Sequence, residues 1–341
     1  MPRTPLCWAL PFHYRMALVG VPAIPLIFLL GQLAHQPLRG AIAAGAAFSV
    51  GFGASRELMG WRWGAMAAAA LGMALAGLCG TLAGWTFPLL ALLSGILATV
   101  CAVLALRDED WWWVALQVVI AFMVAGYFPG DVSAAAWRAG LVLAGGGLQL
   151  AAVALLARLL FPGRVGRLSR GPVQPWPERR IVLGHGLRVA LSVIASLTLA
   201  AAIHLANDYW APLTALVVLK PGLHETSGRG FLRSAGTIGG CLAATGLAVL
   251  ADGRFGPLAA GVSLAIGLAY GLQKANYAVF TAAITLAVVL LVTLGQGGAL
   301  ANAEHRVYAT VIGCLTAIAF AALLPHRPLR PDAGPDRLGP G

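Results

Sequence analysis

Residues 64–106 read GAMAAAALGMALAGLCGTLAGWTFPLLALLSGILATVCAVLAL, a stretch without a single charged side chain. The turn at Gly84–Thr86 divides it into two apolar runs, and each is long enough to cross roughly 30 Å of hydrocarbon as an α-helix. Ala, Gly and Leu dominate both runs, whereas the strands of a membrane barrel would alternate polar and apolar residues. The stretch therefore predicts two consecutive membrane-spanning helices.

The composition of the whole chain agrees with this prediction. Of 341 residues, 59% are hydrophobic and only 10% are charged, whereas a soluble domain carries about a quarter charged residues. The formal net charge of +11 comes mostly from arginines at the ends of apolar runs, and they do not interleave with aromatic residues as on a nucleic-acid-binding face. We therefore expect the lipid bilayer as a partner and no nucleic acid. The five cysteines have no paired spacing, so we expect no metal.

Apolar runs between charged or Gly/Pro-rich breaks predict an all-α polytopic membrane protein of about 12 transmembrane helices. We expect a first six-helix half at 1–162, a cytoplasmic linker at 163–180, a second six-helix half at 181–325, and a disordered cytoplasmic tail at 326–341. The runs lie approximately at 15–33, 37–54, 63–83, 86–106, 111–128 and 137–161, and at 186–205, 209–221, 233–251, 256–273, 275–294 and 305–324.

Matching residues predict that the two halves are repeats. Arg15-Met-Ala-Leu matches Arg188-Val-Ala-Leu at an offset of 173, and Arg138 and Arg306 each precede a glycine by seven residues. Six spans per repeat would make the repeats parallel, related by an axis along the membrane normal. Chance similarity between Ala-, Leu- and Gly-rich helices is the alternative.

The basic residues also predict the orientation. If both termini are cytoplasmic, only Arg39, Arg138, Arg254 and Arg306 of the 23 lysines and arginines fall on the outer side. Cytoplasmic loops carry the excess of Lys and Arg in membrane proteins. We therefore expect a multi-pass protein of the inner (plasma) membrane with cytoplasmic N- and C-termini.

The least regular stretch is Asn207–Gly240, NDYWAPLTALVVLKPGLHETSGRGFLRSAGTIGG. Its apolar part of ten residues covers ~15 Å as a helix, about half the hydrocarbon thickness, and Pro221 ends it. We expect a short broken helix near 209–221, with Lys220 close to the bilayer midplane as a site for a carboxylate. If the helix instead begins near Ala206 and tilts, Lys220 extends to the cytoplasmic surface.

Side chains around Lys220 complete the predicted site. Arg229 and Arg233 lie one helical turn apart and either attract an anion or anchor the helix at the membrane surface. Tyr209 and Trp210 form either a stacking wall or part of an interfacial aromatic belt. The predicted substrate-binding residues are Lys220, Trp210, Tyr209, Thr214, Arg229 and Arg233.

Two weaker features lie nearby. His204 and Asp208 at i, i+4 suggest a proton relay, joined by Glu225 if the broken segment draws it inward, although a solvated pair at the end of a span is the alternative. Gly236 and Gly240 form a GxxxG pattern, which predicts close helix packing. No Asp or Glu falls in the middle of a predicted span, so the residues themselves give no support for proton coupling.

Within this stretch the sequence resembles the aromatic acid exporter / fusaric acid resistance (FUSC-like) family of integral membrane transporters. It is more distantly similar to the plant aluminium-activated malate transporters. The resemblance covers roughly residues 185–325 and rests on Tyr209-Trp210, Leu213-Thr214, Pro221, Thr226, Arg229, Arg233, Gly236-Thr237, Gly240, Arg306, Thr310 and Gly313.

The resemblance implies efflux of aromatic or other small organic acid anions, driven by the proton gradient, and is compatible with a homodimer. Longer members of the family resemble this chain except for a cytoplasmic domain between the membrane halves, where only the 163–180 linker stands here. The expected function is thus a secondary transporter. A passive anion channel and a non-transporting scaffold or lipid-handling protein are the alternatives. Motifs for ATP hydrolysis or for an intramembrane enzyme are missing from the sequence, so we expect no catalytic residues, no enzyme activity and no cofactor.

Overall fold

The computed structural model describes residues 12–164 and 173–324. These residues are all-α, apart from an isolated bridge between Leu58 and Trp61. The helices are α1 (Tyr14–Gly20), α2 (Ala23–Leu33), α3 (Pro37–Gly51), α4 (Gly64–Ala83), α5 (Phe87–Ala105), α6 (Glu109–Gly126), α7 (Val132–Leu160), α8 (Arg179–Ala202), α9 (Trp210–Val218), α10 (Leu223–Ala251), α11 (Phe255–Gly271), α12 (Tyr277–Gln296) and α13 (Ala299–Leu323), with the 3-10 turns η1 (Phe52–Ser55) and η2 (Pro162–Arg164).

Every apolar run found in the sequence overlaps a helix, but fewer than twelve helices are full spans. In the described part of the chain, nine helical stretches are long and apolar enough to cross a membrane, with α1 and α2 counted as one. The helices α3, α9 and α11 fall short of that length. The chain is therefore a multi-pass membrane protein that combines full spans with shorter helices.

Several helices begin earlier than the sequence predicted. The observed starts of α7, α8, α10 and α13 precede the expected residues 137, 186, 233 and 305 by six to ten residues in the last three cases and by five in the first. Hydropathy marks only the lipid-buried part of a helix, whereas polar caps extend it further. Asp131, for example, caps α7 by accepting a hydrogen bond from the Ala134 amide. The predicted tail 326–341 and part of the predicted linker lie outside the described residues.

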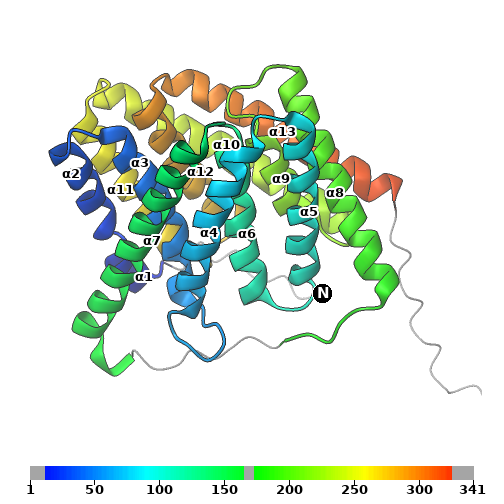
Figure 1. The fold of residues 1–341 in the computed structure, drawn as a ribbon, viewed down its shortest axis with the longest axis horizontal. Helices are drawn as coiled ribbons and strands as arrows, with labels where there is room; N and C mark the ends of the chain where they lie inside the picture. The colour runs from blue at the N-terminus through cyan, green and yellow to red at the C-terminus, as the bar shows by residue number, and fades with distance from the viewer. Residues whose placement is uncertain (1–11, 165–172, 325–341) are drawn as a thin grey trace, which may run out of the picture.

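The two halves of the chain interlock side by side. Within the first half α4 packs against α6 and α7, and within the second half α10 packs against α12 and α13. Between the halves, α8 packs against α5, and α1 packs against α11 (Figure 1). Because α7 ends and α8 begins at the same end of the bundle (Figure 1), we call that end the linker end.

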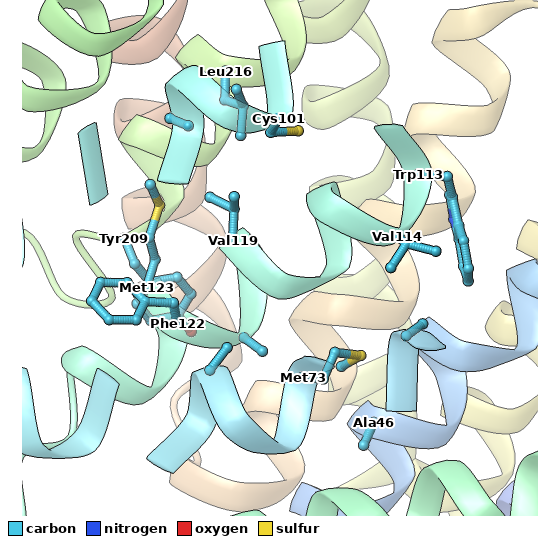
Figure 2. Packing of buried hydrophobic residues seen from close by; sticks show 14 of the residues in the cluster. Ala46, Met73, Cys101, Trp113, Val114, Val119, Phe122, Met123, Tyr209 and Leu216 are labelled. Atoms are coloured by element: carbon cyan, nitrogen blue, oxygen red, sulfur yellow. The ribbon is translucent and has the colours of Figure 1, made fainter. Parts of the chain in front are cut away.

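The buried apolar residues form two clusters, and each draws on both halves. One joins α4–α7 to α8, α9 and α13, and the other joins α2 and α3 to α10–α12. Figure 2 shows Tyr209 and Leu216 from the second half lying among Cys101, Val119 and Met123 of α5 and α6. The segment around α9 is therefore fixed by the first half of the chain.

Candidate functional site

The break between α9 and α10 is held by specific hydrogen bonds. The backbone amide of Lys220 donates to Thr226 Oγ1 over 2.9 Å, and that hydroxyl donates to the Gly222 carbonyl over 2.8 Å. Arg188 of α8, only 1% exposed, donates from Nη1 to the Pro221 carbonyl over 3.0 Å. Because the backbone N–H and C=O groups freed by the break find partners, the four residues between the helices have a defined conformation.

Lys220 lies at the linker end of the bundle and not near its middle. Its Nζ atom is 5.8 Å from the ring centroid of Trp112, in the first turn of α6. At the other end of α9, Tyr209 packs on Tyr127, the residue that ends α6. The rise of α6 between Trp112 and Tyr127 is about 22 Å, so the α9 segment crosses most of the bundle. The midplane expectation for Lys220 does not hold, and the alternative of an extended Lys side chain fits the geometry.

The surroundings of Lys220 weaken its positive charge. Partial burial, followed by the neighbouring charge of Arg229, lowers the pKa of the Lys220 ammonium to about 8, and Glu225 opposes that shift. Desolvation and like charges both disfavour a cation. Lys220 therefore titrates close to physiological pH, at the end of the bundle where α10 begins.

Arg229 and Arg233 lie on α10 one turn apart, as predicted from their spacing, but in different environments. Arg229 donates from Nε to the Val217 carbonyl over 3.0 Å, and its guanidinium lies 4.0 Å from the ring centroid of Tyr277. Arg233 is 8% exposed, and its Nε has no hydrogen-bond partner among the described residues. Arg229 is thus anchored, whereas Arg233 is buried with unused donors.

Arg306 is the residue that sequence reasoning missed. We expected it at the outer surface, but α13 begins at Ala299, so Arg306 lies about 10 Å inside the helix end. It is 4% exposed, lies 4.9 Å from the ring centroid of Trp210, and its Nε is buried without a partner among the described residues. The charge of Arg233 acts on it directly. Its place in the R-x-x-x-T-x-x-G pattern was the one available signal.

The aromatic residues of the predicted site are core residues. Trp210 and Tyr209 are 2% and 5% exposed, and the Tyr209 hydroxyl donates to Asn207 Oδ1 over 3.1 Å. Since Arg306 occupies a face of Trp210, that ring holds the guanidinium in place. Thr214 donates to the Trp210 carbonyl of its own helix over 2.9 Å. The structure thus places these three side chains around Arg306, where they support it.

The residues of the predicted proton relay do not come together. The helix α8 ends at Ala202, and His204 has a left-handed backbone with φ of 54°, so His204 and Asp208 do not share a helix face. Glu225 is exposed in the first turn of α10, at the linker end. Burial raises the pKa of the Asp208 carboxyl to about 6, against a backbone hydrogen bond that lowers it. Asp208 is therefore a titratable group by itself and not one member of a chain of three.

Gly236 and Gly240 lie against the backbone of α12. A Cβ atom on Gly236 would lie 2.3 Å from the Ala278 carbonyl oxygen, and one on Gly240 would lie 2.5 Å from that of Ala282. The two helices approach so closely that a side chain at either position would collide with backbone. This contact brings Arg233, one turn before Gly236, beside the first turn of α12.

Hydroxyl groups line the same contact. Tyr277, Thr281 and Thr285 repeat at every fourth residue of α12, and their buried hydroxyl oxygens have no partner among the described residues, nor has that of Thr237 on α10. Buried polar atoms are usually hydrogen-bonded, so this stripe is available to water or to a polar ligand. In the described parts of the chain no group of three or more His, Cys, Asp or Glu is placed to hold a metal ion.

The comparisons with known proteins point to the same part of the chain. Residues 193–320 match the fusaric acid resistance protein-like family. No curated protein and no solved structure matches significantly. The matched range contains the α9–α10 break, both buried arginines and the α10–α12 contact. Through residues 193–320 this chain belongs to the fusaric acid resistance protein-like family.

Proposed function

We propose that this protein is a secondary transporter that moves small organic acid anions, aromatic acids among them, out of the cell across the inner membrane. The observation that carries the proposal is the pair Arg233 and Arg306. Both guanidinium groups are buried inside the helix bundle, and neither has an acidic partner among the described residues.

An unpaired buried cation is expensive, and two that face each other are more so. Arginine within a membrane normally pairs with a carboxylate or lies beside a water-filled path. A carboxylate substrate would supply the missing negative charge and accept charge-assisted hydrogen bonds from the free N–H groups. The cost of leaving the site empty favours anion binding, which is the property that an anion carrier needs.

The cations also form a series along one wall of the bundle. Lys220 and Arg229 lie at the linker end, Arg233 follows one turn further along α10, and Arg306 lies towards the opposite end on α13. The hydroxyl stripe of α12 borders the same wall. An anion that enters at Lys220 would therefore meet a cationic group at each step towards Arg306.

We further propose that the bundle is built from two parallel six-helix repeats, α1–α7 and α8–α13. The starts of α5 and α6, Phe87 and Glu109, lie 168 residues before those of α11 and α12. The ends of α4 and α10 differ by the same 168 residues. This offset also relates Arg138 to Arg306, but not Arg15 to Arg188, which are 173 residues apart.

Helix packing supports the same relation. A Cβ atom on Gly145 would lie 2.1 Å from the Ala43 carbonyl oxygen, and one on Gly313 would lie 2.4 Å from that of Ala211. Both the glycines and the carbonyls are 168 residues apart. Each repeat thus holds its short helix, α3 or α9, against its last helix by the same contact. Parallel repeats are a common framework for alternating access.

A passive anion channel is the second candidate, and a specific observation favours it. In the described helices, acidic residues lie only within two turns of a helix end, as Glu109, Asp110, Glu225 and Glu304 do. Proton-coupled carriers usually place a carboxylate inside the membrane. Current that follows the membrane potential without a proton gradient would favour the channel over the carrier.

Uptake into inverted membrane vesicles tests the proposal. Radiolabelled 4-hydroxybenzoate and a short panel of other carboxylates would be offered with and without a proton gradient, to wild type and to Arg306→Gln. We expect uptake of at least one acid by wild type and its loss in the variant at equal protein level. If no acid accumulates, or if Arg306→Gln transports like wild type, the proposal is wrong.

A further inference from the structure

A cavity of about 190 Å³ lies in the first half of the chain, apart from α9, α10 and α13. The start of α1, the residues before α4 and the end of α7 form its walls, all at the linker end. Its lining consists of Arg15, Met16, Val19, Ala54, Arg62, Trp63, Val153, Ala157 and Phe161.

Two guanidinium groups make its polar wall. That of Arg62 lies 4.4 Å from the ring centroid of Trp63, and its Nε and Nη1 atoms are buried without a hydrogen-bond partner among the described residues. Arg15 lies 5.5 Å from the ring centroid of Phe161, and its Nε donates to the Tyr14 hydroxyl over 3.2 Å. Aromatic rings therefore fix both cations, while N–H groups remain for an oxygen ligand.

The cavity carries net positive charge. No acidic side chain of the described residues lines it. The carboxylate of Glu57 acts on Arg62, but Glu57 has an interaction of its own and is 7% exposed. Two arginines therefore face one partly engaged carboxylate, which favours an anion in the cavity.

The rest of the cavity is apolar and adjoins the lipid-facing surface. Met16, Val19, Val153 and Ala157 complete the lining. Beside them Leu18 of α1 is 50% exposed, and Leu155 and Leu159 of α7 are 57% and 67% exposed. In a membrane protein such leucines contact acyl chains. A free anion would gain nothing from these apolar walls, whereas an amphiphile with an anionic head group would match both the arginines and the leucines.

We propose that this cavity binds the phosphate head group of an anionic membrane phospholipid. Arg62 and Arg15 contact the phosphate oxygens, and the acyl chains lie along the exposed leucines of α1 and α7. The lipid is a resident ligand of the first half and is separate from any anion that the second half transports.

Native mass spectrometry of the purified, delipidated full chain tests this directly, with phosphatidylglycerol and phosphatidylcholine titrated in parallel. We expect wild type to bind phosphatidylglycerol at least about tenfold more tightly, because charge-assisted hydrogen bonds contribute that much. Arg15→Gln/Arg62→Gln should lose this preference. Arg39→Gln is the matched control, since Arg39 also lies on a tryptophan, 4.8 Å from the Trp137 centroid, but lines no part of this cavity.

A second variant guards against a double mutant that fails to fold. Ala157→Leu fills the cavity and keeps both arginines, so it should also weaken phosphatidylglycerol binding. The proposal is overturned if wild type binds both lipids equally, or if the arginine and cavity variants bind like Arg39→Gln. Excess inorganic phosphate forms the last arm: if it displaces the lipid completely at millimolar concentration, the site recognises a free anion and the lipid assignment is wrong.

Discussion

Arg138 on α7 and Arg306 on α13 occupy matching positions in the two halves, and their surroundings differ. Arg138 donates to Thr81 Oγ1 and to the carbonyls of Ala125 and Phe128, at 3.2 and 2.8 Å for the carbonyls. Arg306 is more deeply buried, has no recorded hydrogen bond, and faces the charge of Arg233. The first arginine is used to join three helices, whereas the second keeps its donors.

This difference teaches that similar frameworks can carry different functions. The glycine–carbonyl contacts at Gly145 and Gly313 are alike in the two halves, so the helix packing is shared. The unpaired cations Arg233 and Arg306 occur in the second half, while the first half contributes packing residues around α9. We therefore assign anion binding to the second half and support to the first.

The largest expected effect comes from Arg306→Gln. Removing the guanidinium takes away the charge and the donors that would hold a carboxylate, so flux should fall at least about a hundredfold, which corresponds to two charge-assisted hydrogen bonds. Arg138→Gln should keep most of the flux but lower the thermal unfolding midpoint, because it removes three internal hydrogen bonds. Initial uptake rates and unfolding curves of both variants check this. Equal loss of flux in the two variants would remove the contrast between the halves.

Arg233→Gln should reduce flux by about tenfold or more, since it leaves one of the two buried cations. Arg233→Lys keeps a charge without the planar fork and should restore part of the activity. Arg254→Gln is a suitable control, because Arg254 is exposed and contacts only the neighbouring Asp252 at 3.5 Å. Uptake by Arg233→Gln at the wild-type rate would show that Arg306 acts alone.

A pH dependence should follow from Lys220. Its pKa of about 8 means that the ammonium is charged below this pH and neutral above it. Flux that uses this charge therefore falls as pH rises through 8, by up to about tenfold between pH 7 and pH 9. Lys220→Arg stays charged and should lose this dependence. An identical pH profile in wild type and Lys220→Arg would mean that another group titrates.

The smallest effect on flux is expected from the shared packing contact. Gly145→Ala and Gly313→Ala should each destabilise the protein by about 1–3 kcal/mol, because the new methyl group must displace a backbone carbonyl. Gly140→Ala, which would meet no atom within 4 Å, is the control. Thermal unfolding of the three variants compares the halves. Destabilisation by only one of the two buried substitutions would argue against a shared framework.

Much of the fold could be predicted from local sequence properties. Uncharged runs such as 64–106 are long enough to span a bilayer, and Pro221 ends a short helix, as observed at Val218. Helix starts were less predictable because hydropathy does not register polar first turns. The start of α13 at Ala299 in place of 305 is the clearest case.

The site was predictable only in part. Spacing placed Arg229 and Arg233 on one helix, but burial separates an anchored arginine from a free one, and burial depends on α12 and α13. Arg306 was taken as a marker of the outer surface because arginines near span ends usually are. Its contact with Trp210 joins residues 96 positions apart in the sequence, so no local pattern reveals it.

The central claim is that Arg233 and Arg306 bind the transported anion, and equilibrium binding to the purified protein tests it most directly. The radiolabelled carboxylate with the highest wild-type flux would be titrated against wild type, Arg138→Gln and Arg306→Gln in detergent. The account predicts similar affinity for wild type and Arg138→Gln, and affinity at least about tenfold weaker for Arg306→Gln. Undiminished binding by folded Arg306→Gln would contradict it.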